Sequence, residues 1–111
     1  MRIYCIHQIN TERPMTLAMV KTDNICSIGI ALMSPKEKNY IKKRGFAIAS
    51  GRAVKNPAVQ FNSAIVEREG GAVPMLFKIA EIIRERLKLK PNTDVSIVMS
   101  EVQRSILGKG A

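Results

Sequence analysis

Residues 34–57 read SPKEKNYIKKRGFAIASGRAVKNP, and this stretch decides how the chain is organised. Ser34 and Glu37 match a capping box, and Pro35 stands at the first helical position, where a missing N–H costs nothing. Pro57 disfavours helical geometry in the residue before it. The pattern therefore predicts a helix from Pro35 to about Lys55.

Three β-rich segments precede this helix. They cover residues 2–8, 16–22 and 25–33. Asp23 and Asn24 separate the last two segments, and both residue types tolerate positive φ, so we expect a tight hairpin there. Gly29 lies inside the third segment and indicates a bulge or a close approach of another backbone.

A second helical pattern follows Gly70-Gly71 and covers residues 74–89. Its apolar residues share one side at helical spacing: Met75, Leu76, Ile79, Ala80, Ile82, Ile83 and Leu87. Residues 95–99 favour a short strand, and a second capping box at Ser100 predicts a short helix to about Leu107. Residues 58–69 fit either a strand or a loop.

This order of elements predicts a single α+β domain over residues 1–111. We expect an antiparallel or mixed sheet of about four to five strands, two main helices on one face and a short C-terminal helix. The N-terminus lacks signal-peptide features and no apolar run is long enough to span a membrane, so we expect a cytoplasmic protein. In a reducing cytosol, Cys5 and Cys26 are most simply small buried hydrophobes.

The charge of the chain is strongly positive and concentrated. The sequence holds 18 Lys and Arg against 9 Asp and Glu, a net charge of +9. Residues 36–55 contribute seven bases and a single acid, Glu37, and packing a small core needs no such excess. We therefore expect electrostatic contacts with the phosphates of DNA or RNA from Lys36, Lys38, Lys42, Lys43, Arg44, Arg52 and Lys55.

The helical wheel of this basic segment is not a clean stripe of cations. One broad apolar side gathers Tyr40, Ile41, Ala47, Ile48 and Val54, whereas Ala49 and Ala53 lie away from it. Arg44 falls within the apolar arc, so it must extend to solvent, pair, or project at an interface. Phe46 falls near the polar side, where it either stacks on a base or packs in a homodimer interface.

Other functions have thinner support in the sequence. A basic surface also suits a protein-interaction module that docks on an acidic host protein. Glu67 and Glu69, at strand spacing, suggest a metal-dependent nuclease, although a solvated strand end before the Gly70-Gly71 turn explains them better. The only histidine is His7, and the sequence shows neither a nucleophile–base pair nor a cluster of metal ligands around it. The sequence thus predicts no catalytic residue, no metal site and no cofactor.

Residues 29–53, GIALMSPKEKNYIKKRGFAIASGRA, resemble a hairpin-to-helix pattern found in small uncharacterised phage and mobile-element proteins. The resemblance covers under a quarter of the chain. It implies a small accessory protein of viral or plasmid origin and assigns no activity to any residue.

Overall fold

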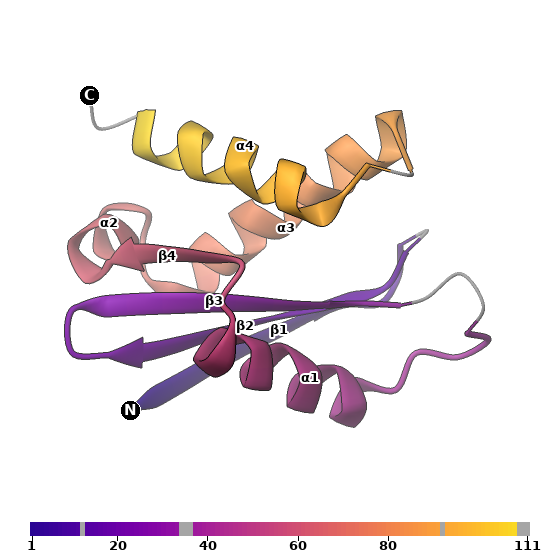
Figure 1. The fold of residues 1–111 in the computed structure, drawn as a ribbon, viewed down its shortest axis with the longest axis horizontal. Helices are drawn as coiled ribbons and strands as arrows, with labels where there is room; N and C mark the ends of the chain where they lie inside the picture. Colours follow the sequence, from indigo (N-terminus) through magenta and orange to yellow (C-terminus); the bar gives the residue numbers. More distant parts are fainter. Residues whose placement is uncertain (12, 34–36, 92, 109–111) are drawn as a thin grey trace.

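A computed structural model describes residues 1–11, 13–33, 37–91 and 93–108 of the chain (Figure 1). Within these ranges the chain is a single α+β domain with the element order β-β-β-α-β-α-α-α. The elements are β1 (Arg2–Gln8), β2 (Met15–Thr22), β3 (Ile25–Leu32), α1 (Lys42–Lys55), β4 (Val59–Asn62), α2 (Ser63–Arg68), α3 (Ala72–Leu89) and α4 (Val95–Gly108).

The described strands form one four-stranded antiparallel sheet in the order β1-β2-β3-β4. The predicted hairpin between β2 and β3 is confirmed, and Asp23 takes the positive φ of 55° that its turn requires. β1 and β4 lie at the two edges. Cys5 of β1 lies opposite Ala18 of β2, which in turn lies opposite Gly29 of β3, so these three residues share one face of the sheet.

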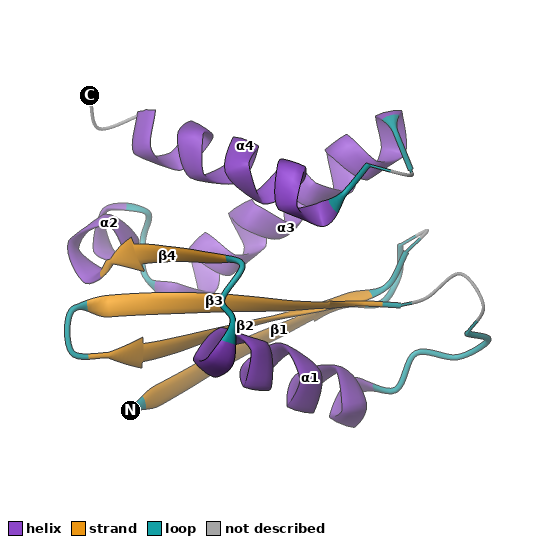
Figure 2. Ribbon diagram, viewed as in Figure 1, coloured by secondary structure: helices purple, strands orange, loops and turns teal. Residues whose placement is uncertain are grey.

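Helices cover both faces of this sheet (Figures 1 and 2). α1 packs on β2 and β3 from one side, whereas α3 packs on β1 and β2 from the other and carries α4. The two main helices therefore do not share one face as the sequence pattern had suggested. The reason lies in β2, which is buried from Met15 to Val20 without alternation, so both of its faces need a cover.

The main hydrophobic core lies between the sheet and α3 and α4. The helix predicted at 74–89 is confirmed with a slightly earlier start, and its expected apolar side is buried except for the partly buried Ile82. The strands contribute the residues that alternate with those under α1, including Leu17, Met19, Ile28 and Phe61. This core contains most of the large buried side chains of the described residues.

The C-terminal prediction was wrong in one element. Residues 95–99 are the first turns of α4 and not a strand. The Asp94 carboxylate accepts hydrogen bonds from the Ser96 N–H at 2.8 Å and the Ser96 hydroxyl at 2.9 Å, which caps the helix six residues before the expected start at Ser100. Val98, Met99, Val102 and Ile106 then pack into the core at helical spacing, which overrides the β propensity of the segment. The undecided residues 58–69 form β4 and α2.

The basic helix begins later than predicted. Residues 37–41 are not helical, α1 begins at Lys42, and Ile41 provides no side-chain cap. Ser34 of the predicted capping box and Pro35 lie outside the described residues, and Glu37 of that box is not helical. The predicted end at Lys55 is confirmed.

The residues that α1 buries against the sheet are all small. Its buried positions are Gly45, Ala49 and Ala53, and Ala49 packs against Ala18 and Ala31 of the sheet. The predicted close approach at Gly29 is confirmed: a Cβ there would lie against the Ala49 carbonyl oxygen and 2.5 Å from the Ala53 nitrogen. The helix backbone thus rests almost directly on β3.

This contact predicts opposite effects for two glycine-to-alanine substitutions. Gly29→Ala should lower the free energy of unfolding by about 1–3 kcal/mol, because the added methyl group forces the backbone of α1 away from the sheet. Gly51 lies in α1 and faces open space, so Gly51→Ala should raise the free energy of unfolding by up to about 1 kcal/mol. Urea unfolding monitored by circular dichroism measures both. Equal effects of the two substitutions would contradict the close packing of α1.

Candidate nucleic-acid interface

The outer surface of α1 collects cations that have no acidic partners. Lys38, just before the helix, and Lys42, Lys43, Arg44 and Lys55 within it are all exposed. Among the residues that the structure describes, none of these five takes part in an ion pair. The ion pairs lie elsewhere: Arg68 and Lys78 pair with Glu69, and Arg86 pairs with Glu101 at 2.8 Å. The positive charge of α1 is therefore not neutralised within the described part of the fold.

Two of the predicted phosphate contacts stand apart from this set. Arg52 donates a hydrogen bond from Nη1 to the Ile30 carbonyl oxygen at 2.7 Å, so its guanidinium is partly engaged in holding α1 on β3. Lys36 lies outside the described residues. The structure therefore brings together five of the seven predicted cations as free side chains on one surface, and it gives Arg52 an anchoring contact.

The apolar side that the wheel assigned to α1 is not its buried side. Ile41 and Val54 are 58% and 60% exposed, and Ile48 and Ala47 are also exposed, whereas Ala49 and Ala53 are buried. Close packing explains the inversion, because only glycine and alanine fit between the helix backbone and the sheet. Phe46 is exposed as well, so its predicted position away from the core is confirmed, although neither of its two proposed roles is tested.

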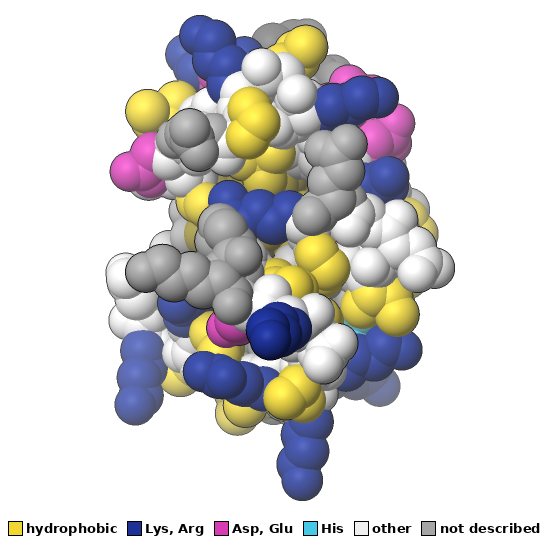
Figure 3. Space-filling model, turned by 90° about the vertical axis from the view of Figure 1, so that its right-hand side faces the viewer, with side chains coloured by type: hydrophobic (Ala, Val, Ile, Leu, Met, Phe, Trp, Pro, Cys, Tyr) yellow, Lys and Arg dark blue, Asp and Glu magenta, His cyan; other side chains and the backbone are white. Residues whose placement is uncertain are grey.

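Charge is unevenly distributed over the molecule. Figure 3 shows Lys and Arg side chains over the height of one face, including its lower part, where α1 lies, whereas most of the visible acidic side chains are higher up, towards α3 and α4. The exposed apolar residues of α1 lie between its cations in the sequence. We define the outer surface of α1 as the exposed side chains of Lys38, Ile41, Lys42, Lys43, Arg44, Phe46, Ile48, Val54 and Lys55.

A partly buried chain of polar groups fixes the segment that leads into α1. His7 Nδ1 lies 2.8 Å from Thr16 Oγ1, and Thr16 forms a short hydrogen bond with the Tyr40 hydroxyl. Gly45 makes this possible, because a Cβ there would collide with the Tyr40 hydroxyl and would lie 2.5 Å from Thr16 Oγ1. Burial raises the pKa of Tyr40, so this phenol stays protonated at neutral pH. Lys38 and Lys42 are thereby held on either side of an anchored tyrosine.

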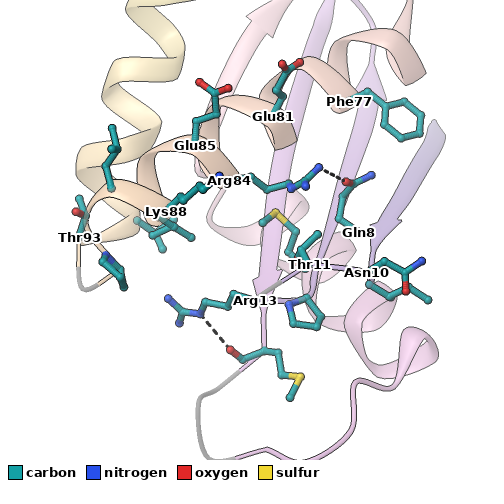
Figure 4. A pocket seen from close by; sticks show the side chains of 18 of the residues that line it. Gln8, Asn10, Thr11, Arg13, Phe77, Glu81, Arg84, Glu85, Lys88 and Thr93 are labelled. Atoms are coloured by element: carbon teal, nitrogen blue, oxygen red, sulfur yellow. Dashed lines mark hydrogen bonds between the residues drawn. The ribbon is translucent and has the colours of Figure 1, made fainter.

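A groove lies on the α3 side of the sheet. It has a volume of about 1800 Å³ and runs between the β1–β2 loop and the second half of α3 (Figure 4). Its charges are mixed, with Arg13, Arg84 and Lys88 beside Glu81 and Glu85. Arg13 donates to the Met33 carbonyl oxygen at 3.2 Å, and Arg84 donates to Gln8 Oε1 at 3.4 Å. Because these arginines are engaged and acidic residues also line the groove, it presents less unbalanced positive charge than the outer surface of α1.

The carboxylates suggested for a nuclease do not lie on a strand. Glu67 is on α2, and Glu69 follows that helix and pairs with Lys78 and Arg68. Within the described ranges, no group of three or more His, Cys, Asp or Glu side chains is placed to hold a metal ion. No helix in those ranges is long and apolar enough to cross a membrane.

In comparisons with protein-family models, with curated proteins and with solved structures, no significant match to the chain was found. The candidate interface therefore rests on its own geometry and charge.

Sequence reasoning missed one cluster of reactive side chains. Cys5 Sγ lies 3.7 Å from His7 Nε2, and His7 contacts Thr16 through its other ring nitrogen. The signal was present, because residues two apart on a strand point to the same face. The hydroxyls of Thr16 and Tyr40 join this cluster from distant parts of the sequence and carry no such signal.

The environment of His7 predicts a pH-dependent stability. Burial and then the positive charge of Lys42 lower the pKa of His7 in the folded state, so below about pH 6.5 the unfolded chain binds more protons than the folded one. The free energy of unfolding should therefore fall as the pH drops from 7.5 to 5.5. Urea titrations at both pH values test this, and His7→Gln should lose most of the difference. A wild-type stability that rises over this interval would contradict the assignment.

Proposed function

We propose that the chain binds nucleic acid through the outer surface of α1, mainly by contacts with the phosphate backbone. The observation that carries this proposal is the set of five exposed cations on α1 and just before it, which have no acidic partners among the described residues. Each such side chain can neutralise a phosphate and release a condensed counterion, which is the dominant source of sequence-independent affinity. The proposal includes no catalytic step.

The shape of α1 supports the same function. The helix packs closely on the sheet through small residues, and its other residues are largely exposed, so a polyanion can reach it along its length. Gly51 presents no side chain on the exposed side and allows close approach of a backbone. Phe46 is exposed one helical turn from Lys42 and Lys43 and offers an aromatic face to an unpaired base.

A second function is favoured by one specific observation. Ile41 and Val54 are more than half exposed beside the cations, and exposed aliphatic residues are more typical of protein interfaces than of phosphate-binding surfaces. The alternative is an interaction module, of viral or mobile-element origin, that docks this surface on an acidic host protein. The two functions differ in whether purified nucleic acid alone is sufficient for binding.

A charge-neutralised variant tests the proposed function. Lys42→Gln, Lys43→Gln and Arg44→Gln together should weaken binding to DNA or RNA. They should also lower the slope of log K against log salt by about 2–3, because each phosphate contact contributes about 0.7–0.9. Fluorescence anisotropy with labelled single-stranded DNA, duplex DNA and RNA at several salt concentrations measures both quantities.

A charge-matched control separates the surface from the net charge. Lys88, Lys90 and Arg104 are exposed on or beside α3 and α4, and among the described residues they take part in no ion pair. Replacing these three by glutamine removes the same charge and should leave most of the salt slope intact. The proposal is rejected if both triple variants lose affinity equally, or if the wild-type chain binds none of the three nucleic acids.

A further inference from the structure

Hydrogen bonds link the cluster at Cys5 and His7 to two hydroxyl groups. Both side chains are half-buried on the α1 face of β1, two residues apart. Thr16 Oγ1 forms a short hydrogen bond with the Tyr40 hydroxyl and lies 2.8 Å from His7 Nδ1. In the tautomer that carries its proton on Nδ1, His7 donates to Thr16 Oγ1. The lone pair of the neutral ring is then on Nε2, the nitrogen that faces Cys5.

The distance between Cys5 Sγ and His7 Nε2 matches a pair of metal ligands. It is 3.7 Å, which is long for a hydrogen bond from a thiol. Zinc binds thiolate sulfur at about 2.3 Å and imidazole nitrogen at about 2.0–2.1 Å, so at a tetrahedral angle the two ligand atoms are about 3.6 Å apart. With Nδ1 protonated, the hydrogen bond from His7 to Thr16 is the kind of outer contact that orients a ligating histidine.

One chain supplies only two ligands, and β1 offers a way to double them. β1 is an edge strand, so its outer backbone groups have no partner strand in the described fold. In antiparallel pairing of two β1 strands about Ile6, Cys5 of each copy lies directly opposite His7 of the other. Directly opposed residues have Cβ atoms about 4.5–5.5 Å apart, so four ligands gather on one face.

The same register matches the exposed apolar residues at this edge. It places Ile3 opposite Ile9 of a second copy, and these side chains are 45% and 40% exposed in a single chain. Arg2 falls opposite Asn10 of the second copy, so no like charges meet. One register thus brings the four ligands together, pairs the exposed apolar residues and keeps like charges apart.

We propose that Cys5 and His7 form half of a tetrahedral zinc site, which a second copy of the chain completes by antiparallel pairing along β1. Binding forms two Zn–S and two Zn–N bonds and releases the two thiol protons, so no oxidant or reductant is needed. The sheet becomes continuous across the two copies. Both α1 helices then lie on the same face of it, because a two-fold axis through the joint is perpendicular to the sheet.

Cobalt provides a visible probe of this site. Purified, reduced chain is titrated with Co²⁺, whose tetrahedral thiolate complexes absorb strongly in the visible region, and Zn²⁺ is then added. The absorption should saturate at one Co²⁺ per two chains and disappear with half an equivalent of Zn²⁺. Sedimentation should show a monomer without metal and a dimer with it. Saturation at one metal per chain, no visible band, or a dimer that forms equally without metal would overturn the proposal.

Variants test the ligands and the register separately. Cys5→Ser and His7→Gln should each abolish the visible band, whereas Cys26→Ala, which changes the buried cysteine on the opposite face, should keep it. Ile3→Asp retains both ligands and should weaken metal-dependent dimerisation at least tenfold. Ile25→Asp is the matched control. Ile25 is 43% exposed on the same face, as the first residue of β3, and its substitution should leave metal-dependent dimerisation unchanged.

Two results from these variants would count against the proposal. Unchanged dimerisation of Ile3→Asp would exclude this register. Rapid alkylation of Cys5 in the presence of excess Zn²⁺ would show a free thiol beside a base, and the cluster would then be a nucleophile pair and not a metal site. None of these outcomes depends on nucleic-acid binding.

Discussion

The close contact between α1 and the sheet is the constraint on which the rest of the structure depends. Gly45, Ala49 and Ala53 rest on a patch of small residues around Gly29, with backbone almost on backbone. Nothing larger fits into this contact, so the helix has no buried position for its bulky side chains. Its cations and its aliphatic residues are consequently displayed together. The same contact that attaches α1 to the fold therefore produces the surface that we propose as the functional one.

The two faces of the sheet differ in their packing and in the pairing of their charges. The face under α3 and α4 buries the large aliphatic side chains and thereby contributes most of the hydrophobic stabilisation. The ion pairs of the described residues also lie on that side, between α2, α3 and α4. The α1 face contributes less buried area and keeps its charges unpaired. An unneutralised cluster of cations opposes folding slightly, and the large core on the other face offsets that cost.

Much of the fold was predictable from local patterns, and the errors have physical causes. The β2–β3 hairpin followed from Asp23 and Asn24, and α3 followed from its helical periodicity, because in both cases local chemistry and tertiary packing agree. The start of α4 was predicted as a strand because it contains β-branched residues. Packing into the core at helical spacing outweighs their β propensity. The helical wheel predicted the wrong buried side for α1. A wheel ranks side chains by hydrophobicity, whereas the close packing of this helix admits side chains by their small size. The concentration of cations in this segment was visible in the sequence, but the anchoring contact of Arg52 depends on the Ile30 carbonyl, which no local pattern places nearby.

The central claim is that the outer surface of α1, and not the groove beside α3, meets the nucleic acid. Backbone amide chemical shifts of the isotopically labelled chain, recorded during titration with a short oligonucleotide, test it directly. The account predicts that the largest shifts fall on residues 38–55, with the amides of α3 and α4 nearly unchanged. Shifts concentrated at Arg13, Arg84 and Lys88, around the groove, would contradict it.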